Sequence, residues 1–136
     1  MTNEIRVPII TDDDIVTARQ EGRRLAASAG FSSTDLTLIA TAISEVARNI
    51  RLYAGEGSVT LDRVREGARE GIVVVARDEG PGITNLELAM QDGFSTGGSS
   101  GLGLPGSRRL MDEFEITSHP GHGVTVTMRK WGPAVV

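Results

Sequence analysis

The chain of 136 residues contains no cysteine and only one lysine. Without cysteine, a disulfide framework, a thiol nucleophile and a thiolate metal site are all excluded. The single lysine, Lys130, lies near the carboxyl end, and arginine supplies the other basic residues. A P-loop needs a lysine directly after its glycines, and a eukaryote-type protein kinase needs a strand lysine upstream of its catalytic loop. Both kinds of phosphate-handling site are therefore excluded.

Long apolar runs are also missing, since none reaches the roughly 20 residues of a membrane span. The amino terminus, with Asn3, Glu4 and Arg6, has no signal-peptide core. We therefore expect a cytoplasmic protein that does not contact membranes. A net charge of -4 argues against nucleic acid as the main partner. With 39% hydrophobic and 24% charged residues, the chain has the composition and length of one globular domain over residues 1–136.

The stretch Ile72 to Ile83, IVVVARDEGPGI, combines a strand with a turn. Its apolar residues 72–76 do not alternate with polar ones, which predicts a strand buried on both faces. Asp78 then stands at the strand end, and Gly80 and Gly82 allow the backbone to turn sharply and to approach a flat ligand. A carboxylate fixed there could accept a hydrogen bond from a ligand amine, such as that of adenine. An ordinary strand and turn is the alternative.

Two helices are predicted before this strand. The first covers residues 15–29 and buries Ala18, Leu25 and Ala26, and the aspartates at 12–14 are interpreted as helix-start residues, with a divalent-metal cluster as the alternative.

The second helix runs from a cap near Ser32 to about Ala54, with Gly55 as its stop. Glu45 and Asn49 are four residues apart and therefore share one helix face. This pair suits a general base beside a magnesium ligand, because an Asn oxygen suits a hard cation that phosphates already hold. A solvated polar face with an incidental Asn is the alternative.

Alternating residues predict the remaining strands and their connections. The predicted segments are a strand at 4–10, a strand at 57–64 joined through a turn at 65–71 to the strand at 72, and final strands at 114–118 and 124–131, with fraying after Gly132.

The segment Gly93 to Gly106, GFSTGGSSGLGLPG, is rich in glycine and carries no charge. It precedes a predicted helix at 107–114, and a helix amino terminus after such a segment favours phosphate. A disordered surface loop is the alternative. Gly101, Gly103 and Gly106 spell the dinucleotide fingerprint, but no strand precedes them and no acidic residue follows at about 20 positions. We therefore reject a nicotinamide dinucleotide site.

Taken in order, these signals form a recognisable set. Glu45 and Asn49 on a helix, Asp78-x-Gly80-x-Gly82 after a strand, and a glycine-rich Gly101-Leu102-Gly103-Leu104 resemble the N, G1 and G2 boxes of the Bergerat-type ATP-binding superfamily. Within it, stretches such as TAISEVARNIRLYAGEG and GLPGSRRLMDEF are similar to the small serine/threonine kinases of bacterial stress-response switches, the RsbT type.

The resemblance implies an α/β (α+β) two-layer sandwich in which helices cover one face of a mixed sheet, with ATP and Mg²⁺ as cofactors. Glu45 is implied as the catalytic base, Asn49 as the magnesium ligand and Asp78 as the acceptor for the adenine amine. The remaining implied contacts are Gly80 and Gly82 with the base, and Gly101, Gly103, Leu104 and Gly106 with the phosphates.

The resemblance also implies partners. A STAS-domain protein would serve as phosphoacceptor and sequestering scaffold, and a PP2C-type phosphatase regulator would be activated by the released kinase. A non-catalytic binding module, acting on a sigma factor or a phosphatase, and a stand-alone ATPase switch remain the rival functions. In one departure, the family often has Thr directly after Gly123, where this chain has Val124 and then Thr125. Either the register differs or the contacts to adenine are weaker.

Overall fold

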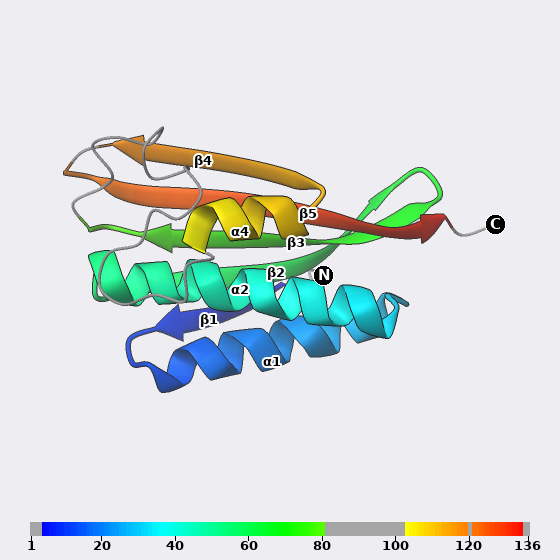
Figure 1. Ribbon diagram of the computed structural model, residues 1–136, viewed down its shortest axis with the longest axis horizontal. Coiled ribbons are helices and arrows are strands. Elements are labelled where there is room, and N and C mark those ends of the chain that lie inside the picture. Colours follow the sequence, from blue (N-terminus) through cyan, green and yellow to red (C-terminus); the bar gives the residue numbers. More distant parts are fainter. Residues whose placement is uncertain (1–3, 81–102, 120, 135–136) are drawn as a thin grey trace.

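The computed structural model describes residues 4–80, 103–119 and 121–134. Within these residues, helices lie on one face of a five-stranded sheet (Figure 1). None of the described helices is long and apolar enough to cross a membrane. In chain order the elements are β1 (Ile5–Ile9), α1 (Asp13–Ser28), α2 (Ser33–Tyr53), β2 (Gly57–Glu66), β3 (Arg69–Asp78), α4 (Gly103–Leu110), β4 (Glu113–His119) and β5 (Gly123–Ala134).

The strand order is β1-β2-β3-β5-β4, and every pair of neighbours in it is antiparallel. The predicted two-layer fold is confirmed, but the prediction of a mixed sheet is wrong in this detail. Helices α1 and α2 run in opposite directions between β1 and β2, so the chain re-enters the sheet antiparallel to β1 (Figure 1). Strand β4 does run in the same direction as β3, but β5 folds back between them (Figure 1).

Strand β3 is buried on one face, not on both as its sequence predicts. Ile72, Val74 and Ala76 are buried beneath the helices, whereas Val73 and Val75 are only partly buried on the opposite face. Because helices cover only one face of an antiparallel sheet here, the other face needs no apolar cover. The run of β-branched residues therefore reflects strand propensity as well as burial.

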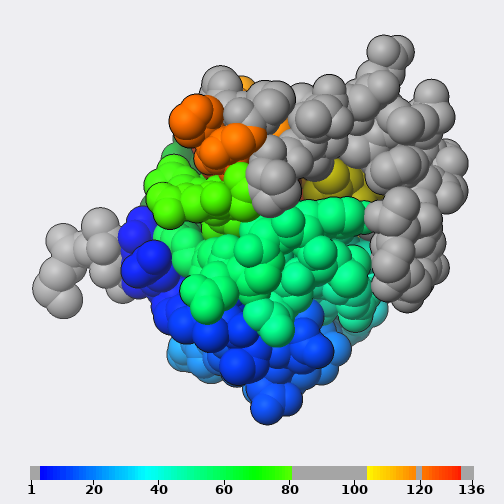
Figure 2. All heavy atoms as spheres, turned by 90° about the vertical axis from the view of Figure 1, so that its left-hand side faces the viewer, coloured from blue at the N-terminus to red at the C-terminus, as the bar shows by residue number. Residues whose placement is uncertain are grey.

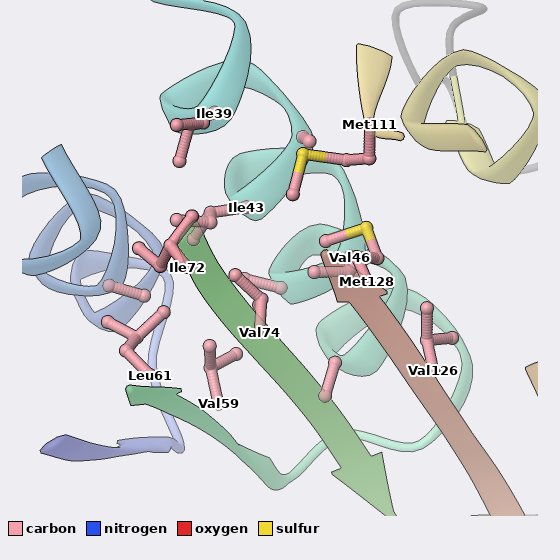
Figure 3. Close-up of a cluster of buried hydrophobic side chains, with 14 of the residues drawn as sticks. Ile39, Ile43, Val46, Val59, Leu61, Ile72, Val74, Met111, Val126 and Met128 are labelled. Atoms are coloured by element: carbon pink, nitrogen blue, oxygen red, sulfur yellow. The ribbon is translucent and has the colours of Figure 1, made fainter. Parts of the chain in front are cut away.

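The hydrophobic core lies between α2 and the three central strands. Figure 3 shows Ile43 and Val46 of α2 pointing toward Val74 of β3 and Met128 of β5. Met111, which follows α4, packs on the same cluster (Figure 3). This core holds α2 in place over the ends of the central strands.

The helix boundaries follow local chemistry. The Ser32 side chain caps α2 by accepting from the Asp35 N–H at 3.2 Å, and Gly55, at φ +85°, follows its last turn. Both confirm the predicted helix. In α1 the predicted stripe of Ala18, Leu25 and Ala26 is buried, as expected.

Among the three aspartates at 12–14, Asp14 in the first turn of α1 stabilises the helix start. Asp14 Oδ2 accepts from the backbone N–H groups of Ile10 and Thr11, both at 2.9 Å. Hydrogen bonds donated to a carboxylate stabilise its charged form. These two N–H groups therefore lower the pKa of the Asp14 carboxyl below its usual value. Asp12 at the N-cap position makes no side-chain capping bond.

The predicted turn at 65–71 is too long. Glu66 pairs directly with Arg69, so the turn is reduced to residues 67 and 68, with Gly67 at φ +61°. Arg63 and Glu70 form a cross-strand ion pair at 2.9 Å. Charged residues that suggest a loop in the sequence are therefore strand residues whose partners lie on the neighbouring strand.

The predicted helix at 107–114 is displaced by one turn, since α4 begins at Gly103 and ends at Leu110. Pro105 suits the first turn of a helix, where its missing N–H costs nothing. At the other end, the buried Lys130 Nζ donates to the carbonyl of Leu110 at 2.9 Å, which satisfies one of the last carbonyls of the helix. Phe114 belongs to β4 instead.

The last strand is also longer than predicted. The sequence predicts fraying after Gly132, but β5 continues to Ala134, which pairs with Arg69. The Arg69 guanidinium lies 4.3 Å from the centre of the Trp131 ring, and Trp131 Nε1 donates to Glu113 Oε2 at 2.6 Å. The pairing of Ala134 with Arg69 extends the strand beyond the predicted end, and the contacts of Trp131 fix the residue just before it.

Candidate functional site

Asp78 is held at the end of β3 by its own loop and by β5. Its Oδ1 accepts from the backbone N–H of Gly80 at 2.9 Å and from that of Val124 at 3.3 Å. No hydrogen bond to Oδ2 is found within residues 4–80, 103–119 and 121–134. The carboxylate therefore has a fixed orientation, with one oxygen bound to the protein and the other able to meet a ligand donor.

Glycines bring the backbone close around this carboxylate. A Cβ at Gly80 would lie 2.5 Å from the Ala54 Cβ, so the loop packs directly on the carboxyl end of α2. Gly123 has φ +96°, and a Cβ there would lie 2.1 Å from the Asp78 carbonyl oxygen. Figure 2 looks onto this end of the molecule, where the green end of β3 lies against the teal end of α2. The predicted close approach at Gly80 is therefore, in the described residues, an approach to α2.

Glu45 is buried, which makes the alternative of a solvated polar face wrong for this residue. It is 4% exposed, and its Oε1 accepts from Arg48 Nη1 at 2.9 Å. A charged side chain at this position gives no signal of burial in the sequence, and α2 is packed against α1, α4 and the sheet. The burial is thus a product of tertiary contacts.

Asn49 lies one turn further along α2 and has an unsatisfied amide. Its Nδ2 is buried and has no hydrogen-bond partner within the described residues. Buried polar atoms without a partner are rare in proteins, so such an atom suggests a missing ligand. An N–H donor needs an acceptor, so the free Nδ2 fits a phosphate oxygen or a water of a bound nucleotide. The other end of the same amide, its oxygen, is the atom that could bind a magnesium ion.

Of the glycines and Leu104 that are predicted to contact the nucleotide, some lie within the described residues and others do not. Gly82 and Gly101 lie outside the described residues, as does the predicted glycine-rich segment up to residue 102. Gly103 begins α4, Gly106 is buried within it, and Leu104 is 8% exposed in the hydrophobic core. A role of Leu104 toward phosphate must therefore use its backbone N–H, because its side chain packs inward.

Helix α4 is held against α2 by a buried hydroxyl. Ser107 is fully buried, and its Oγ donates to the Ala42 carbonyl at 3.5 Å. Sequence reasoning did not single out Ser107, since a Ser in a helix gives no signal of burial. It also missed Arg48, although the three-residue spacing from Glu45 was readable in the sequence.

The register of β5 settles which residue faces Asp78. Val126 pairs with Ala76 and is buried on the helix side, so Val124 lies on the same face and Thr125 on the opposite one. Val124 packs on the core and reaches Asp78 only through its backbone N–H. Thr125 therefore does not take the place of the family Thr, and the register does not slip.

The histidine kinase-like ATPase domain family matches residues 10–130, which is most of the chain. The chain belongs to this family. Serine/threonine-protein kinase RsbT of Bacillus subtilis is 47% identical over 131 residues, which cover 96% of this chain and 98% of that protein. Anti-sigma F factor of Caldanaerobacter subterraneus is 35% identical over 97 residues, which cover 68% of each chain. The predicted membership in the RsbT-type serine/threonine kinases of bacterial stress-response switches is confirmed.

Two solved structures share the fold. A Mycobacterium tuberculosis chain with RsbU and RsbW domains aligns over 98% of this chain and 33% of its own length, with a TM-score of 0.61 and 22% identity. The mycobacterial sensor histidine kinase MprB aligns over 99% of this chain and 100% of its own, with a TM-score of 0.54 and 14% identity. At these identities the likeness concerns the fold, and it confirms the predicted histidine-kinase-like class.

Proposed function

We propose that this kinase transfers the terminal phosphoryl group of magnesium-bound ATP to a serine or threonine of a STAS-domain partner. Once released from that partner, which also sequesters it, the kinase binds and activates a PP2C-type phosphatase regulator. The observation that carries the proposal is the polar face of α2, where Glu45 is buried and the Asn49 Nδ2 donor has no partner among residues 4–80, 103–119 and 121–134.

Asp78 binds the nucleotide base in this proposal. Its carboxylate is already oriented by two backbone N–H groups on Oδ1, so it can accept the adenine amine without losing rotamer freedom. A charge-assisted bond of this kind is worth about 1.5–3 kcal/mol. The amino terminus of α4 favours phosphate oxygens, because the first N–H groups of a helix have no partner within the helix and the helix dipole is positive there.

Glu45 and Asn49 act on the transferred group. ATP supplies the phosphoryl group, and magnesium neutralises charge on its oxygens. Asn49 would hold the metal through its amide oxygen. Glu45 would take the proton of the acceptor hydroxyl as the new bond from that oxygen to phosphorus forms and the bond to the ADP oxygen breaks.

The test separates these two roles. Glu45→Gln, which keeps volume in a buried position, should leave ATP affinity nearly intact while slowing phosphorylation by about 10² to 10⁴, the usual contribution of a general base. Asn49→Ala should weaken magnesium-dependent ATP binding and transfer together. Labelled ATP with candidate STAS-domain proteins measures transfer, and calorimetry measures binding.

Glu21 offers a matched control. It pairs with Arg24 at the same three-residue spacing, but it lies on α1 rather than α2 and its side chain is 32% exposed. Glu21→Gln should phosphorylate the partner at the wild-type rate. A folded Glu45→Gln protein that does the same would refute the assigned base, and a wild type that binds ATP and partner without transfer would favour the binding module.

A further inference from the structure

Two Glu–Arg ion pairs at three-residue spacing lie on neighbouring helices, and they differ in burial. In the Glu21–Arg24 pair the carboxylate side chain is 32% exposed and that of Arg24 is 70% exposed. In the Glu45–Arg48 pair the carboxylate is 6% exposed and that of Arg48 is 38% exposed. The first is an ordinary surface pair, which contributes little. The second has a buried anion and a cation at the surface.

A buried carboxylate needs a fixed partner. Desolvation of the charge is costly unless a cation or donors compensate it, and Arg48 Nη1 lies 2.9 Å from Glu45 Oε1. The guanidinium is planar and directional, so it restricts the rotation of the carboxylate as well as neutralising it. Arg48 also precedes Asn49 directly, so one helical turn carries the base, its cation and the proposed metal ligand.

We propose that Arg48 is a positioning residue for phosphoryl transfer, which holds the Glu45 carboxylate in the orientation that receives the acceptor proton. This inference rests on the proposed role of Glu45. A base must lie within hydrogen-bond reach of the hydroxyl it deprotonates, and a displacement of about 1 Å in such a group can reduce a rate by about 10²-fold. The Arg48 guanidinium, which lies on the more exposed side of α2, prevents such a displacement of the Glu45 carboxylate.

The experiment is a double-mutant cycle on kcat, using purified kinase, ATP with magnesium and a STAS-domain substrate. Arg48→Gln should lower kcat by about 10- to 100-fold while leaving the KM for ATP and for the substrate protein within about twofold. In the Glu45→Gln background, the same substitution should have almost no further effect, because the group it positions is gone. Arg24→Gln on α1 is the matched control and should leave all rate constants unchanged.

A conservative variant at position 48 serves as the control in case Arg48→Gln is unstable. Because Arg48→Gln leaves a buried carboxylate without its cation, it can lower stability, and thermal melting records this separately from kcat. Arg48→Lys retains the charge but lacks the planar fork, so it should fold and show a smaller loss of kcat, again only when Glu45 is present.

Several outcomes would overturn the inference. If folded Arg48→Gln and Arg48→Lys both keep the wild-type kcat, Arg48 only compensates the charge of Glu45 and does not position it. A raised KM for the substrate protein with kcat unchanged would make Arg48 a docking residue. An equal loss of kcat in the Glu45→Gln background would show that it acts through another group. The proposed base itself fails only if Glu45→Gln transfers at the wild-type rate, which the same cycle measures independently.

Discussion

Asp78 illustrates how a single side chain is prepared by its surroundings. One carboxylate oxygen accepts two hydrogen bonds. One comes from a backbone N–H of its own loop and the other from a backbone N–H of β5, which is remote in the sequence. Val124, the donor from β5, faces the same side of the sheet as Ala76, but its side chain offers no hydroxyl. Within the described residues, the backbone therefore fixes one oxygen of Asp78, and the side chain of β5 that follows Gly123 is apolar.

Adding a side-chain hydroxyl at position 124 should strengthen nucleotide binding. Val124→Thr changes one methyl to a hydroxyl of similar size beside Asp78, and a net hydrogen bond is worth about 0.5–1.5 kcal/mol. We expect ATP affinity by calorimetry to rise by about 2- to 10-fold. Thr125→Val, on the opposite face of β5, should leave affinity unchanged. Equal affinities of Val124→Thr and the wild type would show that this position does not contact the nucleotide.

At the scale of elements, α1 is positioned by contacts at its start and in its middle. At its start, the Asp14 carboxylate fixes the turn between β1 and α1 by accepting hydrogen bonds from two backbone N–H groups of that turn. In its middle, Gly22 lets the helix approach α2, because a Cβ there would lie 2.2 Å from Ile43 Cδ1. Ile43 is fully buried, so its methyl has no open space into which to move.

Gly22→Ala should destabilise the protein even though Ala is the better helix former. The propensity gain is about 1 kcal/mol, whereas overpacking a buried contact costs typically about 1–3 kcal/mol. Ile43→Val removes the Cδ1 that the new methyl would meet, so the two substitutions together should cost less than the sum of their separate effects in urea unfolding. Strict additivity would mean that the helices separate freely at this point.

The Asp14 contact predicts a pH-dependent loss of stability. Because folding lowers the pKa of Asp14, its contribution is present above the unfolded value of about 3.9 and is lost as pH falls through the folded value. Asp14→Asn should therefore lower the melting temperature at neutral pH, and the difference from wild type should shrink as the pH falls through the folded pKa of Asp14. Asp13→Asn makes the same charge change at the same helix start without the two capping bonds. A difference between the two variants that persists unchanged in acid would contradict this origin.

On the scale of the whole molecule, one core joins the described elements. The helices share the same face of a single sheet, and the cluster in Figure 3 draws residues from α2 and from three strands. Trp131, the only tryptophan, pairs with Gly71 at the opposite end of β3 from Asp78. It therefore reports on the sheet at a distance from the site.

We expect the chain to unfold as one unit, with tryptophan fluorescence and far-ultraviolet circular dichroism giving the same midpoint. ATP with magnesium should raise this midpoint, since a ligand that binds only the folded state stabilises it by about 2.7 kcal/mol at 100 times its Kd. Asp78→Asn, which folds but lacks the acceptor for adenine, should lose most of the rise. Two separated transitions would indicate independent units, and an undiminished rise in the variant would place the nucleotide elsewhere.

Features that depend on neighbouring residues can be predicted from the sequence alone. The cap at Ser32, the stop at Gly55 and the buried stripe of α1 follow from spacing and capping chemistry, which act within a few residues. The position of Asp78 at a strand end and its likeness to a known set of boxes follow from the same local order. The family was therefore readable before any contact was known.

Features that depend on distant segments follow from tertiary contacts and could not be predicted from the sequence. The insertion of β5 between β3 and β4 makes the sheet antiparallel, and helices on one face alone leave Val73 and Val75 partly exposed. Glu45 is buried by tertiary packing around α2, and the register of β5 places Val124 rather than Thr125 on the helix side of the sheet. Each outcome depends on which surfaces meet, and local propensity does not encode that choice because the partners lie tens of residues apart in the chain.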